Sequence, residues 1–167
     1  MNLTEFLDTP WGEILATMAF SMLPVVELRG GIPFGVLLGL HPVTAFFASL
    51  IGNMIPTPFI IIYIRRLFQW TRRRFPRLEY LVDRLEQKAH LKGQTVLKYQ
   101  NLGLFLFVAV PLPGTGGWTG ALIAAFLDIR LRHALPSIFL GLITAGIIVL
   151  CLTMFAGAAI STALPIS

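Results

Sequence analysis

Three long stretches without a charged residue constrain this chain most. Residues 30–64, 99–127 and 133–167 contain no Asp, Glu, Lys or Arg. Each is longer than the roughly 18 apolar residues that mark a membrane-embedded segment. Of all 167 residues, 56% are hydrophobic and 13% are charged, against about 25% charged in soluble domains. The sequence therefore predicts an all-α integral membrane protein with a single domain over residues 1–167, and argues against a soluble enzyme or a nucleic-acid-binding domain.

The basic residues gather between the apolar stretches. Residues 65–98 hold ten Lys and Arg but only three acids, which by the positive-inside rule predicts that this segment is cytoplasmic. Pro76 precedes apolar residues at helical spacing, which predicts an amphipathic helix on the inner leaflet. The basic side chains expected to touch anionic lipid head groups are Arg65, Arg66, Arg72, Arg73 and Arg74.

Two of the apolar stretches are interrupted by helix-breaking residues. Residues 111–120 contain two prolines and four glycines, and residues 24–33 contain two of each. Such segments are unfavourable inside a regular helix, and the apolar flank on either side is too short to span a bilayer. Each interrupted stretch therefore predicts a re-entrant hairpin, which enters and leaves the membrane on the same side.

Two stretches are long enough to cross the membrane completely, residues 43–64 and 135–164. With residues 65–98 cytoplasmic, the first hairpin opens outside and the second opens inside. The chain then reads as two inverted repeats, residues 10–64 and 99–164, each a hairpin plus a transmembrane helix. Paired interrupted segments of this kind are typical of secondary transporters. So short a chain offers few helices to enclose a path, which is consistent with a homodimer.

Glu27 and Arg29 stand out because a charge at bilayer depth costs roughly 2.5–3.5 kcal/mol. The neighbouring prolines and glycines favour an extended segment, in which residues i and i+2 point to the same side. Two interpretations stay open. Arg29 binds an anion while Glu27 takes up and releases a proton, or the two form an ion pair that braces the hairpin. Asn53 is a further polar residue at depth that either satisfies backbone freed by Pro56 or binds substrate.

The glycine-rich hairpin tips are the second candidate site. Glycines leave backbone N–H groups open, and the half-helix after each tip would present its positive end to the membrane centre. Together with one arginine, they describe a site for a phosphate or carboxylate. The alternative is that the glycines only permit tight turns and close packing. The predicted substrate-binding residues are Arg29, Gly30, Gly31, Pro113, Gly114, Thr115, Gly116, Trp118 and Thr119, with Glu27 as the proton-coupling residue.

Motifs of enzymes and metal sites are missing from the sequence. Gly114-Thr115-Gly116 is not followed by the Gly-Lys-Ser/Thr of a P-loop, and the chain has neither a nucleophile elbow nor a His-Glu-x-x-His motif. Its one cysteine, Cys151, excludes a disulfide framework or cysteine-based metal cluster within the chain. We therefore expect no enzymatic activity, no catalytic residue, no metal and no cofactor.

Two motifs carry a resemblance to a known family. Residues 27–33 read Glu-Leu-Arg-Gly-Gly-Ile-Pro, and residues 111–120 read Pro-Leu-Pro-Gly-Thr-Gly-Gly-Trp-Thr-Gly. With Gly52-Asn53, these resemble the bacterial family of small multidrug export proteins over nearly the whole chain. That family is distantly similar to DedA-type membrane proteins, which share paired re-entrant hairpins containing an acid and an arginine. The resemblance implies motif roles for Glu27, Arg29, Pro33, Pro111, Pro113, Gly114, Thr115 and Trp118.

DedA-type proteins are implicated in proton-coupled movement of polyprenyl-phosphate lipid carriers. The resemblance and the residues together predict a multi-pass, proton-coupled secondary transporter of the bacterial cytoplasmic membrane. Its substrate would be an amphipathic anion such as a lipid phosphate. Its other partners would be membrane lipids and protons, with no nucleic acid. Two alternatives stay open: an exporter of small cationic drugs, and a membrane scaffold or assembly factor that transports nothing.

Overall fold

The computed structural model describes residues 9–74, 93–112 and 114–163, and within these ranges the regular structure is helical, without a strand. The all-α prediction is therefore confirmed for this part of the chain. The predicted amphipathic helix after Pro76 and the residue Pro113 lie outside the described residues. The helices are α2 (Pro10–Ser21), α3 (Glu27–Leu37), α4 (Pro42–Met54), α5 (Pro56–Arg74), α7 (Gly93–Ala109), α8 (Gly117–Phe126) and α9 (Leu131–Ala163).

Proline sets several of the helix boundaries. α2 begins at Pro10, after Thr9, whose hydroxyl accepts a hydrogen bond from the Gly12 N–H at 3.1 Å. α4 begins at Pro42. The fixed φ of proline suits the first helical position, where its missing N–H costs nothing. Pro56 separates α4 from α5 at Ile55, so the helix is interrupted within the stretch from residue 43 to 64.

The segment from Glu27 to Pro33 is helical, contrary to the extended conformation expected from its glycines and proline. α3 begins at Glu27 and continues through Pro33 to Leu37. The irregular connection is confined to residues 22–26. A proline removes one backbone hydrogen bond, which a helix packed on its neighbours tolerates. α3 is packed in this way, against α2, α4 and α9.

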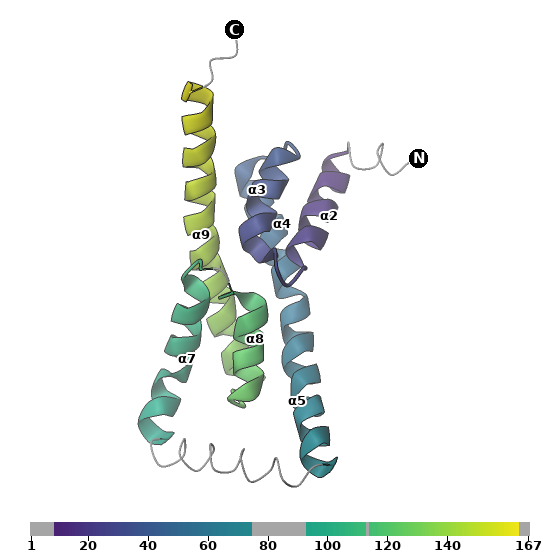
Figure 1. The fold of residues 1–167 in the computed structure, drawn as a ribbon, viewed down its shortest axis with the longest axis vertical. Helices are drawn as coiled ribbons and strands as arrows, with labels where there is room; N and C mark the ends of the chain where they lie inside the picture. Colours follow the sequence, from purple (N-terminus) through teal and green to yellow (C-terminus); the bar gives the residue numbers. More distant parts are fainter. Residues whose placement is uncertain (1–8, 75–92, 113, 164–167) are drawn as a thin grey trace.

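The helices form two groups joined by long elements (Figure 1). α2 and α3 lie in the half of the molecule toward which α9 ends, whereas α7 and α8 lie toward the opposite end. The connection between α2 and α3 and the connection between α7 and α8 both lie near the middle. α9 packs against α3 and α4 in one group and against α7 and α8 in the other, and α5 packs against α8. We call α2 with α3 the first helical hairpin and α7 with α8 the second. The two hairpins thus meet tip to tip beside the longer helices.

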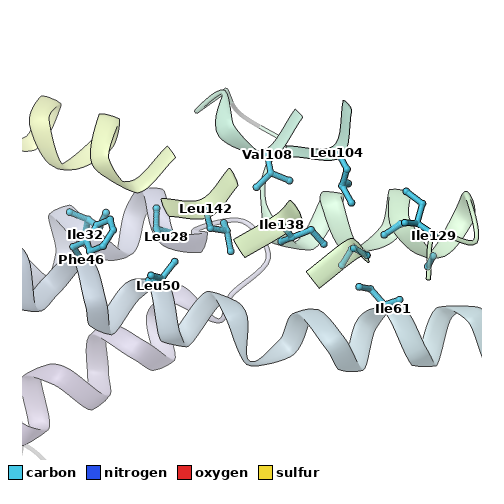
Figure 2. Packing of buried hydrophobic residues seen from close by; sticks show 14 residues of the cluster. Leu28, Ile32, Phe46, Leu50, Ile61, Leu104, Val108, Ile129, Ile138 and Leu142 are labelled. Carbon is cyan, nitrogen blue, oxygen red and sulfur yellow. The ribbon is translucent and has the colours of Figure 1, made fainter. Parts of the chain in front are cut away.

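A continuous apolar core links the two groups (Figure 2). Leu28, Ile32, Phe46 and Leu50 fill the end formed by α3 and α4. Ile138 and Leu142 of α9 continue the core toward the second hairpin, whose contributions are Leu104, Val108, Ala121, Ala124 and Ala125. α9 therefore provides apolar contacts to both hairpins.

The outer surface of the described residues is also apolar. Val25, Leu37 and Phe155, for example, are 94%, 86% and 75% exposed. An apolar surface this extensive would be unfavourable in water. Two stretches are long and apolar enough to cross a membrane, Pro42–Leu67 and Leu131–Ala159. They coincide with the two crossings predicted from the sequence.

Close packing of small residues holds α2 against α4. A Cβ atom on Gly52 would lie 2.9 Å from the Met18 Cα, inside the backbone of α2. We expect Gly52→Ala to lower the free energy of unfolding by about 1–3 kcal/mol, the usual cost of overpacking. Thermal unfolding in detergent or nanodiscs measures the change. Gly103→Ala is the matched control, because nothing lies within 4 Å of its added Cβ. Equal stability of the two variants would contradict the close approach.

Candidate functional site

The candidate site lies where the two hairpin tips meet. One tip comprises residues 22–26 and the start of α3, and the other comprises residues 110–112, residues 114–116 and the start of α8. Glu27, Arg29 and the Trp118 indole each form hydrogen bonds across the junction, from one tip to the other. The sequence separations of these hydrogen bonds range from 81 to 96 residues.

The Glu27 carboxylate caps the N-terminus of α8. Its Oε1 accepts a hydrogen bond from the Trp118 backbone N–H at 3.1 Å. The N-cap residue Gly116 has no side chain of its own to do this, and a Cβ there would overlap the Glu27 carboxylate. Glu27 also has a positive φ of 52° and is 6% exposed. A buried acid from one hairpin thus satisfies a helix end of the other, in the place that the helix dipole favours for a negative charge.

The Arg29 guanidinium binds the loop that follows α7 in the second hairpin. It donates hydrogen bonds to the carbonyl oxygen of Leu112, to that of Val110 at 3.2 Å and to the Thr115 hydroxyl at 2.9 Å. Val110 follows directly on the C-terminus of α7, where a positive charge is favourable, and Leu112 and Thr115 belong to the loop beyond it. Within the pair itself, Arg29 Nη1 lies 4.0 Å from Glu27 Oε2.

Hydrogen bonds within and between the tips hold the second loop in place. The Trp118 indole N–H donates to the Met22 carbonyl oxygen at 3.1 Å, from the second hairpin back to the first. The Thr115 hydroxyl lies 2.7 Å from the Val110 carbonyl oxygen, and the Thr119 hydroxyl donates to the Gly114 carbonyl oxygen at 2.8 Å. Gly114 has a φ of +84°, which a residue with a side chain rarely adopts. Thr115, Gly116 and Trp118 therefore lie together with Glu27 and Arg29, as the site prediction requires.

The first glycine pair does not form an open helix end. Gly30 and Gly31 lie inside α3, and the Gly30 N–H donates to the Val26 carbonyl oxygen at 3.0 Å. A Cβ on Gly31 would collide with the hydroxyls of Ser21 and Ser49. The expectation that backbone N–H groups at Gly30 and Gly31 are open is wrong for Gly30, because α3 begins three residues earlier. At Gly31 the structure favours the close-packing interpretation.

Residues 27–148 match the model of a protein family described as "Putative small multi-drug export protein". The chain belongs to this family. No curated protein and no solved structure matches it. Membership of the export family and the two long apolar helices assign the chain to a membrane and to a class of transporters. The matched region begins at Glu27, so it contains every residue of the cross-hairpin contacts except Met22.

The predicted lipid-facing arginines of this family member differ in their surroundings. Arg65 donates a hydrogen bond to the Ile129 carbonyl oxygen, and its Nε lies 3.4 Å from Asp128 Oδ1. It thus ties α5 to the connection between α8 and α9. Arg66 is exposed. The side chains of Arg72, Arg73 and Arg74 lie outside the described residues, and contact with lipid head groups stays a prediction for all five.

Asn53 belongs to the same site, although the sequence alone left its role open. The side chain is fully buried, and within the described residues neither its Oδ1 nor its Nδ2 has a hydrogen-bond partner. Its Oδ1 lies 3.0 Å from the position that a Cβ of Gly117 would take, at the first turn of α8. One helical turn earlier, the buried Ser49 hydroxyl also lacks a partner in this part of the chain. In the sequence, this site residue is indicated by a polar amide side chain within the charge-free residues 30–64.

Proposed function

We propose that this export-family protein is a proton-coupled secondary transporter of the bacterial cytoplasmic membrane. Its substrate is an amphipathic anion such as a polyprenyl phosphate. The observation that carries the proposal is that both charged residues of the first hairpin tip bind the second hairpin: Glu27 caps α8, and Arg29 binds the loop that follows α7. An acid and an arginine held at the interior junction of two movable hairpins supply a proton site and an anion site side by side.

The proposed topology has two re-entrant hairpins that enter from opposite faces of the membrane. α2, α3 and α8 contain 12, 11 and 10 residues, about 15–18 Å at 1.5 Å per residue, or roughly half of the 30 Å hydrocarbon core. The hairpin tips lie near the middle of the molecule while their open ends face opposite ways (Figure 1). This arrangement supports inverted repeats, in which alternating access is a movement of one hairpin against the other.

The hydrogen bonds of Arg29 suggest how substrate would enter this cycle. The acceptors of Arg29 are neutral carbonyl and hydroxyl oxygens at the loop of residues 110–116. A phosphate offers the guanidinium charged, bidentate acceptors, which bind it more strongly than neutral ones. Arrival of the anion would therefore free the loop from Arg29 and loosen the contact between the hairpins. The hydrophobic tail of the substrate would remain among the apolar outer surfaces.

Export of small drugs is the second candidate, favoured by the description of the family. A site for a cation favours an acid whose charge is not balanced nearby, whereas the Glu27 carboxylate lies 4.0 Å from the Arg29 guanidinium. That pairing supports an anionic substrate. A membrane scaffold that transports nothing is the third possibility, for which the cross-hairpin contacts would be purely structural.

Translocation in proteoliposomes tests the proposal. We expect the wild-type protein to move a fluorescent isoprenyl phosphate between leaflets, and to do so asymmetrically when a proton gradient is applied. One pH unit supplies about 1.4 kcal/mol per proton, enough for a roughly tenfold imbalance between leaflets. Liposomes without protein and liposomes with an uncoupler are the controls. Movement of a cationic dye alone would favour the drug exporter, and movement of neither probe would favour the scaffold.

A further inference from the structure

Two features beside the first turn of α8 are not explained by helix capping alone. One is Asn53, a fully buried amide with neither polar atom paired in the described part of the chain. The other is the pair of glycines, Gly116 and Gly117, whose missing side chains leave room for Glu27 and Asn53 respectively. An unpaired buried amide is costly and persists where a ligand or a second state satisfies it. Both features point to a polar ligand at this helix end.

The place is suited to an anion, and an anionic group already occupies it. Helix N-termini bind phosphates and carboxylates through backbone N–H groups and the helix dipole. Here the acceptor on the Trp118 N–H is the Glu27 carboxylate, 3.1 Å away. Arg29 lies beside it, 4.0 Å from the Glu27 carboxylate. The donors that would hold a phosphate are therefore assembled around the carboxylate of the protein's own glutamate.

We propose that the N-terminus of α8, with Asn53 and Arg29, is the anion-binding site, and that Glu27 occupies it as an internal competitor. This inference rests on the proposed function and names the recognised group, a phosphate monoester. A negatively charged Glu27 repels a second anion from the same helix end. A proton on Glu27 removes that repulsion, so the carboxyl yields its place to the phosphate. The Asn53 Nδ2 then donates to the phosphate and loses its unpaired state.

The competition makes the direction of coupling definite. Because the phosphate enters as the proton neutralises Glu27, one proton and one anion occupy the site together and travel in the same direction. Among the described residues, Arg29 is the charged side chain that contacts Glu27, and the other groups at this helix end, Gly116 against Glu27 and Asn53 against Gly117, are neutral. The proton therefore has Glu27 as its acceptor at this junction.

Binding measurements on Glu27→Gln and Asn53→Leu test the inference. Glutamine removes the charge but keeps an oxygen that can accept from the Trp118 N–H. We expect Glu27→Gln in nanodiscs to bind a short-chain isoprenyl phosphate at least about tenfold more tightly than wild type does. Adding Asn53→Leu to this variant should weaken binding roughly tenfold, the loss expected for one hydrogen bond to a charged group. Glu13→Gln on α2 is the matched control and should bind like wild type.

A second measurement keeps the test decisive if a variant is poorly folded. In wild-type protein labelled with 15N-tryptophan, isoprenyl phosphate should shift the Trp118 amide resonance and leave that of Trp11 unchanged. Inorganic phosphate forms the other arm. Binding of inorganic but not isoprenyl phosphate by Glu27→Gln would uphold the anion site while refuting the lipid substrate. Unchanged or weaker binding of both probes by folded Glu27→Gln, with no Trp118 shift in wild type, would overturn the inference.

Discussion

Arg29→Ala is expected to reduce proton-driven translocation of an isoprenyl phosphate by at least about 100-fold. The substitution removes hydrogen bonds to Leu112, Val110 and Thr115, and with them the only guanidinium at the hairpin contact within the described residues. Hydrogen bonds to a charged group are worth about 1.5–3 kcal/mol each. Loss of about 3 kcal/mol from the transport-competent state corresponds to roughly 100-fold in rate. The proteoliposome assay measures this rate directly.

Two further variants distinguish loss of the anion-binding group from loss of the folded structure. Arg29→Lys keeps the charge but has no planar fork for two acceptors, so an intermediate rate is expected. Arg66→Ala removes an exposed arginine from α5 and should transport at the wild-type rate. Thermal unfolding of each variant reports folding independently. A wild-type rate for Arg29→Ala would refute the anion site and favour the drug exporter.

Gly116→Ala is expected to destabilise the protein by about 2–5 kcal/mol and to uncouple transport from the proton gradient. The new Cβ would occupy the position of the Glu27 carboxylate. The N-terminus of α8 would lose its cap, a change worth about 1–2 kcal/mol. Crowding at a buried position adds about 1–3 kcal/mol. Calorimetric unfolding in nanodiscs and the Trp118 amide resonance measure the two effects.

The control for this substitution is Gly157→Ala near the end of α9. Nothing lies within 4 Å of the Cβ that it adds, so stability and transport should match the wild type within about 0.5 kcal/mol. If Gly116→Ala unfolds at the wild-type temperature and leaves the Trp118 resonance in place, the carboxylate does not sit against Gly116.

Local sequence signals predicted the second hairpin better than the first. Residues 110–112 and 114–116 are irregular, as expected from Pro111, Gly114 and Gly116, although Gly117 and Gly120 lie inside α8. In the first hairpin, the same residue types led to a wrong prediction of an extended segment. Gly30 and Gly31 lie within α3, where they allow close packing instead of forming a turn. Tertiary packing overrides intrinsic propensity in such cases. The charge-free stretches located both segments that are long and apolar enough to cross a membrane, because length and apolarity can be read from the sequence of a segment alone.

The site was predicted as a set of residues but not as a set of contacts. Glu27, Arg29, Thr115 and Trp118 all lie at the junction of the hairpins. Arg29 and its acceptor Leu112 are 83 residues apart in the sequence, and Glu27 and its donor Trp118 are 91 apart. At such separations, residue spacing in a single sequence does not predict a contact. The role of Asn53 depended on the same information, since its burial against Gly117 arises only when α4 and α8 pack together.

The binding of Glu27 and Arg29 to the second hairpin also bears on how the protein is made. While the ribosome has delivered only the first half of the chain, Glu27 and Arg29 have neither the Trp118 N–H nor the Leu112 carbonyl to bind. An ion pair without these hydrogen-bond partners is costly in the hydrocarbon core. In the proposed topology, we therefore expect the first hairpin to reach its final depth only after the second has been inserted, so that membrane integration of the two halves is a single cooperative event.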